Sequence, residues 1–190
     1  MLEIPDQDPI YSVEVHCIMQ SDDQKEAGPL WHLHEVRSPM AQRVASENPK
    51  LYQRRANAYE NKLETYIEHL TQLVEGEDFD VITKAPSSRE DAQPYFDSIK
   101  AEFPDALDLS DCFSKKDDCK AGSAGSLKEF LPCLFFDCDS ELGDYSSLLI
   151  VDDLMSNGLT AAAMIRRLYE EGLQDEAEIS VAVPLLLREK

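Results

Sequence analysis

The stretch that decides the fold is SSLLIVDDLMSNGLTAAAMIRRLYEEG, residues 146–172. Its apolar run, residues 148–151, is typical of a strand buried on both faces of a parallel sheet. Two acids, Asp152 and Asp153, follow directly, and a helical pattern begins near Leu159. Ligands of open α/β sheets bind at the carboxyl ends of the strands, so we expect both carboxylates to lie at a binding site.

The connection between the acids and the helix carries Ser156, Asn157, Gly158, Leu159 and Thr160. It offers hydroxyl and amide donors and a flexible glycine, and the N-terminus of the following helix favours an anion. Donors suit a phosphate and carboxylates suit a sugar diol. A helix-capping loop without a ligand is the alternative, but the two acids, their spacing, the glycine and the helix together favour a ligand site.

Short apolar runs alternate with helical patterns on both sides of this stretch. This alternation predicts βαβ units around a mostly parallel sheet flanked by helices, an α/β fold. The segment SKKDDCKAGSAGS, residues 114–126, has no periodicity and is predicted to be a mobile loop. The expected strands are FDVIT (79–83), ALDLSDCF (106–113), PCLFFD (132–137), SSLLIV (146–151) and EISVAVPLLL (178–187), with helices near 89–102 and 159–171.

The N-terminal part has a different pattern of apolar residues. YSVEVHCIM, residues 11–19, alternates like a half-buried strand. Asn48-Pro49 predicts the start of a helix, and apolar residues then recur every three or four positions until Gly76. We therefore divide the chain into residues 1–76, a tail, strand and long helix that form a cap region, and residues 77–190, the core.

Composition restricts the class of protein. The 190 residues include 38 acidic and 18 basic side chains, a net charge of −20, which repels polyanions and argues against direct nucleic-acid binding. The acidity serves either as a solubility surface or as attraction for a basic protein partner. Residues 1–20 lack the basic region of a signal peptide and no apolar stretch is long enough for a membrane span, so we expect a cytoplasmic location.

The five cysteines are an odd number without a secretory signal, which argues against a disulfide framework and for reduced thiols. Their spacings contain no paired C-x-x-C, as a zinc site would require. His32 and His34 would share one face of an extended segment, but no third ligand accompanies them.

LLIVDDLMSNGLT, residues 148–160, resembles the phosphoribosyl-pyrophosphate motif of the type I phosphoribosyltransferases. That motif has a hydrophobic strand, two acids, two apolar residues and then Thr-Thr-Gly-x-Thr or Ser; Asn157 stands where a hydroxyl residue is customary. The resemblance implies a phosphoribosyltransferase-like fold. It also implies that Asp152 and Asp153 hold the ribose hydroxyls and that Ser156 to Thr160 wrap the 5-phosphate.

Two further segments resemble the family more loosely. The run Lys84, Ala85, Pro86, Ser87, Ser88 and Arg89 is similar to its pyrophosphate loop, which implies that Lys84 and Arg89 are catalytic cations; a plain turn with a capping serine is the alternative. Residues 114–126, with Lys115 and Lys116, fall where the family has a flexible catalytic lid, although a solvated linker explains them equally well.

The resemblance implies binding of phosphoribosyl pyrophosphate with Mg²⁺, which Asp152 and Asp153 would hold indirectly, through ribose or water. The reaction implied is transfer of the phosphoribosyl group to a nitrogen nucleophile with release of pyrophosphate. The alternative is a weak or inactive sensor that binds the sugar diphosphate or a nucleotide and signals to a protein partner, as a competence or defence accessory. The short tail after the last strand resembles the ComF-like branch, and a homodimer is also possible.

Overall fold

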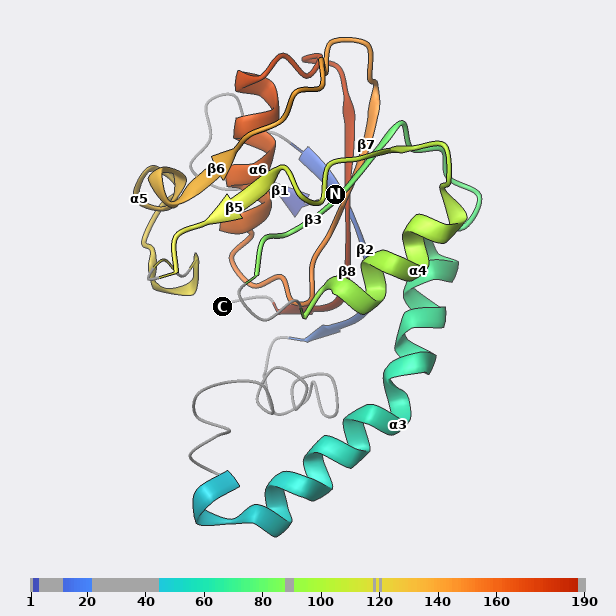
Figure 1. The fold of residues 1–190 in the computed structure, drawn as a ribbon, viewed down its shortest axis with the longest axis vertical. Coiled ribbons are helices and arrows are strands. Elements are labelled where there is room, and N and C mark those ends of the chain that lie inside the picture. The colour runs from blue at the N-terminus through green and yellow to red at the C-terminus, as the bar shows by residue number, and fades with distance from the viewer. Residues whose placement is uncertain are drawn as a thin grey trace.

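The computed structural model describes residues 2–3, 12–21, 45–87, 91–117, 119 and 121–187. The predicted αβ alternation is present over the core (Figure 1). The elements in chain order are β1 (Leu2–Glu3), β2 (Ser12–Ser21), α3 (Pro49–Val74), β3 (Val81–Lys84), α4 (Gln93–Glu102), β4 (Leu107–Asp108), β5 (Phe113–Lys115), η1 (Ala121–Ser123), α5 (Leu127–Phe130), η2 (Leu131–Cys133), β6 (Leu134–Phe136), β7 (Ser147–Val151), α6 (Leu159–Glu170) and β8 (Glu178–Leu187).

A six-stranded sheet forms the centre, in the order β1-β2-β8-β7-β3-β4. All of its pairings are parallel except that of β1 with β2. The predicted α/β class with a central, mostly parallel sheet is therefore confirmed. The expectation that PCLFFD joins this sheet was wrong, because β6 pairs with β5 in a separate antiparallel ribbon.

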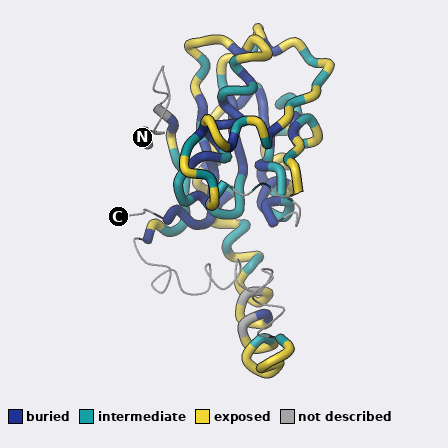
Figure 2. The backbone as a smooth tube through the Cα atoms, turned by 90° about the vertical axis from the view of Figure 1, so that its left-hand side faces the viewer, coloured by how far each residue is buried: buried dark blue, intermediate teal, exposed yellow. Residues whose placement is uncertain are grey.

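Helices cover both faces of the sheet, which explains the uninterrupted apolar run of β7. Leu148 and Ile150 pack in one core with α6, whereas Leu149 and Val151 pack in a second core with α3 and α4. Side chains of a strand alternate between its two faces, so a strand covered on both faces needs apolar residues at every position. In Figure 2 the central strands β3, β7 and β8 are accordingly largely buried.

The sheet order reverses between β3 and β7. The chain leaves β3 through α4 to reach β4 on one side, and leaves β7 through α6 to reach β8 on the other. The two connections therefore diverge above the ends of two neighbouring parallel strands. Such a switch point leaves a crevice outside the carboxyl ends of the strands, where open α/β sheets bind ligands.

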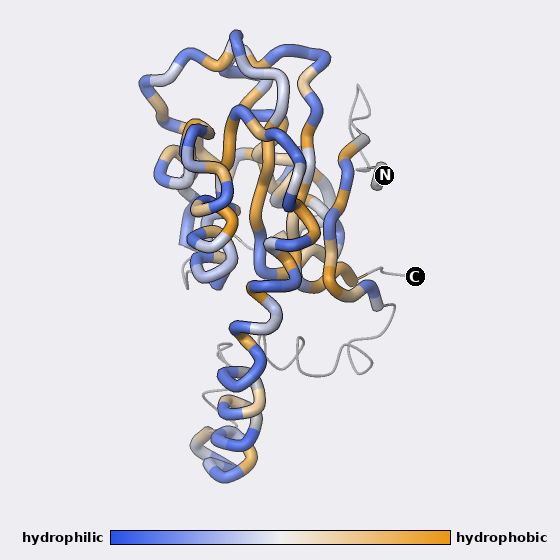
Figure 3. Tube along the Cα trace, turned by 90° about the vertical axis from the view of Figure 1, so that its right-hand side faces the viewer, coloured by the Kyte–Doolittle hydropathy of each residue, from blue (hydrophilic) through white to orange (hydrophobic). Residues whose placement is uncertain are grey.

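The long helix predicted after Asn48 is confirmed as α3. The Asn48 Oδ1 accepts a hydrogen bond from the Leu51 N–H at 3.2 Å, and Pro49 occupies the first turn. Leu70 and Val74 are buried against α4 and the sheet, whereas Leu73, expected on the same apolar face, is 43% exposed. The first half of α3 runs away from the sheet and is largely hydrophilic (Figure 3). Only its last turns therefore lie across the sheet.

The strand expected near residues 11–19 is β2, which pairs in parallel with β8, so that Val15 lies opposite Val181. The N-terminal part thus contributes a strand to the same sheet as the core. The division at residue 76 stays a prediction. Among the residues that the structure describes, no helix is both long and apolar enough to cross a membrane.

Two expectations about residues 114–126 and the cysteines need correction. Cys119 and Cys133 form a disulfide, although the sequence argued for reduced thiols. The segment also contains the end of β5 and the short helix η1, so it is not wholly irregular. The reason is tertiary: pairing with β6 and the covalent link fix a stretch that has no periodicity of its own.

Candidate functional site

A cleft of about 800 Å³ opens at the switch point of the sheet. The segments that line it are residues 84–87 at the end of β3, residues 92–93 at the start of α4, the β5 region between 110 and 117, Cys119 and η1, residues 152–161 from β7 into α6, and Val181 in β8. The site residues predicted from sequence that meet in this cleft are Lys84, Ala85, Pro86, Ser87, Lys115, Lys116, Asp152, Asp153, Ser156, Asn157, Gly158, Leu159 and Thr160. Segments far apart in the sequence thus surround one space, as the motif requires.

Two of the predicted residues, Ser88 and Arg89, lie outside the described residues. The proposed cap also contributes little that can be seen, since no described residue before Lys84 lines the cleft. Sequence reasoning missed several lining residues, including Gln93 on α4 and Asp111 before β5. Neither stands in a recognisable motif, so only the tertiary structure could reveal them.

The acidic pair directly follows β7, where the backbone still belongs to the sheet. The Asp152 N–H donates to the Ala182 carbonyl at 3.0 Å, which continues the pairing with β8. The Asp153 N–H donates to the Asp152 Oδ1 at 2.8 Å. The two carboxylates are therefore held next to each other at the floor of the cleft.

The environment disfavours a negative charge on Asp152. Burial of the carboxyl group raises its pKa well above the usual range, and the neighbouring Asp153 raises it further. The positive charge of Lys115 acts in the opposite direction but does not offset these effects. A ligand that brings positive charge or hydroxyl donors would relieve the unfavourable placement of the pair.

The loop after the acids turns sharply at Gly158, which has φ 69° and serves as the N-cap of α6. A Cβ at this position would adopt the left-handed region and lie 3.1 Å from the Met155 Cε. The backbone conformation therefore favours glycine, and a Cβ would also require Met155 to shift slightly. The turn aims the N-terminus of α6 at the cleft, where helix dipole and N–H groups favour an anion.

Asn157 joins two sides of the cleft. Its Oδ1 accepts a hydrogen bond from the Leu159 N–H at 3.2 Å, and its Nδ2 donates to the Ala121 carbonyl in η1 at 3.3 Å. One side chain thus shapes the loop before α6 and links it to η1, in the connection between β5 and β6. The sequence predicts Asn157 as a phosphate-binding residue and as a departure from the motif, but not this link to η1.

The loop after β3 begins in register with β7, because the Ala85 N–H donates to the Val151 carbonyl at 2.8 Å. The Lys84 ammonium group does not extend freely into the cleft. It donates to the Gln93 Oε1 and lies 5.9 Å from the centroid of the Phe96 ring. Gln93 in turn donates to Asp97 at 2.6 Å. The ammonium group has three N–H donors, so its bond to Gln93 leaves donors for an anionic ligand.

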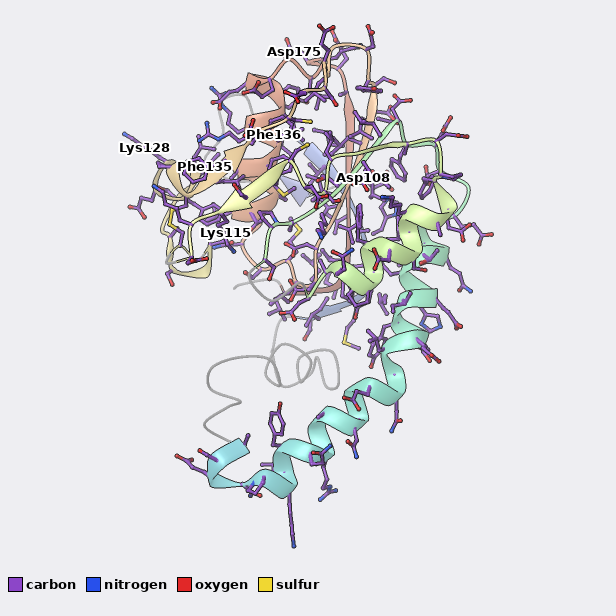
Figure 4. All side chains as sticks on the ribbon, viewed as in Figure 1. Asp108, Lys115, Lys128, Phe135, Phe136 and Asp175 are labelled. Carbon is purple, nitrogen blue, oxygen red and sulfur yellow. A yellow bond between two sulfur atoms is a disulfide. The ribbon has the colours of Figure 1, made fainter. Side chains whose placement is uncertain are left out.

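Among the described residues, Lys115 at the end of β5, labelled in Figure 4, and the adjacent Lys116 are further cations that line the cleft. Lys115 is near enough to Asp152 to influence its ionisation. The Lys116 ammonium lies 5.4 Å from the ring of Phe135, which is 44% exposed. The disulfide fixes the chain just beyond these lysines, since it ties Cys119 to Cys133 at the start of β6.

Comparisons with known proteins give structural likeness only. No family model matches the chain, and no curated protein matches it. The structure is similar to an adenine phosphoribosyltransferase from Thermoanaerobacter pseudethanolicus, with 18% identity, TM-score 0.41 and coverage of 68% of this chain and 81% of that one. It is also similar to a purine phosphoribosyltransferase from Pyrococcus horikoshii, with 17% identity, TM-score 0.45 and coverage of 68% and 83%. A third likeness, at 22% identity and TM-score 0.38, is to a Leishmania donovani UMP synthase, of which the chain covers 23% and which covers 68% of this chain.

Proposed function

We propose that the cleft binds phosphoribosyl pyrophosphate and that the protein transfers its phosphoribosyl group to a nitrogen nucleophile. The observation that carries this proposal is the convergence of three segments on one space: the acids Asp152 and Asp153, the loop that opens α6, and residues 84–87. These segments offer carboxylates for a sugar diol and two separate groups of donors for two phosphate groups. Phosphoribosyl pyrophosphate carries its sugar diol between the 5-phosphate and the diphosphate, so its parts match the three segments.

Each segment has a defined task in this proposal. Asp152 and Asp153 accept hydrogen bonds from the ribose hydroxyls, and the loop of Ser156 to Thr160 holds the 5-phosphate with the first N–H groups of α6. Residues 84–87 hold the diphosphate, with Lys84 donating to it through the N–H groups that Gln93 leaves. The nitrogen nucleophile attacks the anomeric carbon as its bond to the diphosphate oxygen breaks, and the nitrogen then loses a proton. The family's ComF-like branch receives no support from the structures compared and is not part of the proposal.

The residues fit a magnesium ion that arrives with its substrate. The described part of the chain has no cluster of three or more His, Cys, Asp or Glu residues suited to a metal, so a cage made only of protein ligands is not expected there. Mg²⁺ commonly takes one or two carboxylates, waters and substrate oxygens, which matches the adjacent pair Asp152 and Asp153. When bound, Mg²⁺ supplies positive charge beside the diphosphate.

Positioning and exclusion of water are the contributions expected from the ribbon. Lys115 and Lys116 face the same space as the acids. A cation near the departing diphosphate stabilises the charge that develops on it, and this effect is strongest where water is excluded. Because the ribbon is tethered by the disulfide and by Asn157, these lysines are held close to the sugar site before the substrate arrives.

A binding module with little turnover is the second candidate. The specific observation in its favour is that Asn157 and Lys84 are already engaged, with Ala121 and Gln93 respectively. In this state one N–H donor of each side chain is already bonded to the protein and is not left for phosphate. Such a module would bind the sugar diphosphate or a nucleotide and pass this state to a protein partner, for which the net charge of −20 suits a basic surface.

The deciding experiment combines binding with turnover. Phosphoribosyl pyrophosphate with MgCl₂ should raise the melting temperature, whereas ribose 5-phosphate with MgCl₂ should raise it less because it lacks the diphosphate. Pyrophosphate release is then followed with a panel of purines, pyrimidines and amines. Turnover on any of them supports the transferase, and binding without turnover supports the module. No stabilisation by the sugar diphosphate overturns the transferase and a module that senses this sugar.

A further inference from the structure

Four of the five cysteines lie at the two ends of the β5–β6 ribbon. Cys119 and Cys133 close one end with a disulfide. At the other end, Cys112 directly precedes β5 and Cys138 follows β6 by two residues; neither belongs to a disulfide, and both are half-buried. The function proposed for the cleft uses neither thiol.

The ribbon brings these two thiols together. Phe113 lies opposite Phe136, with ring centroids 4.8 Å apart. The Asp137 N–H donates to the Cys112 carbonyl at 2.9 Å, so the pairing of the chains continues past the ends of β5 and β6. Cys138 is the next residue, so Cys112 and Cys138 lie beside each other at this end of the ribbon, and each thiol influences the pKa of the other. Cysteines on paired segments can form a disulfide when their Cα atoms lie within about 7 Å, as Cys119 and Cys133 do at 5.9 Å.

The surroundings make the two thiols unequal. Burial raises the pKa of Cys112 to about 12, helped by Cys138 and by the negative charges of Asp111 and Asp108. Burial also acts to raise the pKa of Cys138, and Asp139 adds to this. Hydrogen bonds from the Cys112 thiol and from the backbone and hydroxyl of Ser140 outweigh both effects, so that the pKa of Cys138 is lowered. Cys138 is therefore the more acidic thiol of the two, and Cys112 the less acidic.

We propose that Cys112 and Cys138 form a thiol–disulfide exchange site for small-molecule disulfides such as glutathione disulfide. The Cys138 thiolate attacks one sulfur of the small disulfide, whose S–S bond breaks to release a thiolate that takes a proton from water. Cys112 then loses its proton to solvent and attacks the Cys138 Sγ of the mixed disulfide, which releases the second small thiol. Two protein thiols are oxidised and one small disulfide is reduced to two thiols.

The resulting Cys112–Cys138 disulfide would link the second end of the ribbon covalently, as the Cys119–Cys133 disulfide links the first end. Asp111 and Phe113, the neighbours of Cys112, both line the cleft, so the exchange site adjoins one of its walls. The chemistry of the two thiols does not depend on what the cleft binds. The site can therefore be tested, and can fail, separately from the proposed phosphoribosyl transfer.

The test uses the full chain with its Cys119–Cys133 disulfide intact. The protein is incubated with glutathione disulfide, quenched with acid, alkylated and mapped by peptide mass spectrometry. We expect the unaltered protein to form a Cys112–Cys138 disulfide without retained glutathione, and Cys112→Ser to retain glutathione on Cys138. Cys138→Ser should react at least about tenfold more slowly near neutral pH, because the remaining thiol is mostly protonated.

A pH profile separates a linked pair from two independent thiols. Cys112→Ser keeps a hydroxyl donor to Cys138, whereas Cys112→Ala removes it, so the pH at which Cys138 reacts at half its maximal rate should rise only in the alanine variant. Cys17→Ser, in β2, is the matched control and should behave like the unaltered protein. The proposal is overturned if the unaltered protein retains glutathione on both thiols, if both react at equal rates, or if neither reacts. The measurement on the unaltered protein needs no substitution, so a variant that fails to fold does not rescue the proposal.

Discussion

The loop from Asp152 to Thr160 and the β5–β6 ribbon face each other across the same cleft, yet different physics positions them. The loop is fixed by neighbours in sequence: a strand end, a glycine with positive φ and the start of a helix. The ribbon is fixed by partners far along the chain, namely the register of β5 with β6 and the disulfide between Cys119 and Cys133. One side of the cleft is thus positioned by residues close together in the sequence, and the other side by contacts between residues far apart in the sequence.

The largest expected effect is a loss of stability when the disulfide that holds the ribbon is removed. Replacing Cys119 and Cys133 by serine removes a link across a sequence separation of 14 residues, for which the chain-entropy model gives a loss of about 3 kcal/mol. We expect a lower midpoint of denaturant unfolding and faster trypsin cleavage after Lys115 or Lys116. Cys17→Ser, which removes a cysteine from β2, is the control. An unchanged midpoint and an unchanged cleavage pattern would mean that strand pairing alone holds the ribbon.

The next largest effect is expected on ligand binding, when the two acids of the loop from Asp152 to Thr160 are replaced. A ligand at a hundredfold excess over its Kd stabilises the native state by about 2.7 kcal/mol. Asp152→Asn with Asp153→Asn should abolish the gain in melting temperature given by phosphoribosyl pyrophosphate and MgCl₂. The matched control, Asp144→Asn with Asp175→Asn, makes the same charge change at two exposed positions and should keep the gain. A full gain in the Asp152 and Asp153 variant would refute the proposed site.

The acidic pair Asp152 and Asp153 also predicts that the stability of the ligand-free protein depends on pH. The pKa of Asp152 is raised in the folded state, so the native protein binds more protons than the unfolded chain above pH 3.8. Its stability should therefore fall as the pH rises from that value through the folded pKa. Asp152→Asn removes this loss, and its melting temperature should equal or exceed that of the unaltered protein at neutral pH. A variant that melts well below the unaltered protein at pH 7 would contradict this account.

Gly158→Ala sharpens the comparison because it perturbs the loop alone. The left-handed backbone costs about 1–2 kcal/mol for a residue with a Cβ. The added atom would also lie 3.1 Å from Met155 Cε. Gly76→Ala is a useful control, since Gly76 has φ +87° and nothing within 4 Å of a Cβ, so it carries the backbone cost only. We expect the Gly158 variant to be the less stable of the two by denaturant unfolding; equal losses would mean that Met155 moves aside freely.

The same division explains which features the sequence predicts. The strand β7, the helix α6 and the helix α3 follow from periodicity, a glycine and an Asn-Pro start, all contained in contiguous residues. The ribbon could not be predicted from the sequence. The apolar run that contains Phe135 looks like a strand of a parallel sheet, and the residue that pairs with Phe135, Ser114, lies 21 residues earlier in the chain. An odd number of cysteines likewise gave no sign that one pair would be bridged. The bond from Lys84 to Gln93 joins residues nine positions apart that no sequence motif links.

The smallest expected effect concerns Asn157, where the two sides of the cleft meet. Its hydrogen bond to the Ala121 carbonyl contributes about 0.5–1.5 kcal/mol to holding the turn of η1 against the loop. Asn157→Thr supplies a hydroxyl that can bond the Leu159 N–H or a phosphate but does not reach Ala121 as the amide does. We therefore expect trypsin to cleave faster after Lys115 or Lys116, and phosphoribosyl pyrophosphate to bind more tightly, as measured by calorimetry. Asn157→Ala is the control: it should loosen the same segment without tightening binding. If Asn157→Thr weakens binding while cleavage is unchanged, Asn157 contacts the ligand directly, and a ligand other than the phosphoribosyl diphosphate fits the cleft.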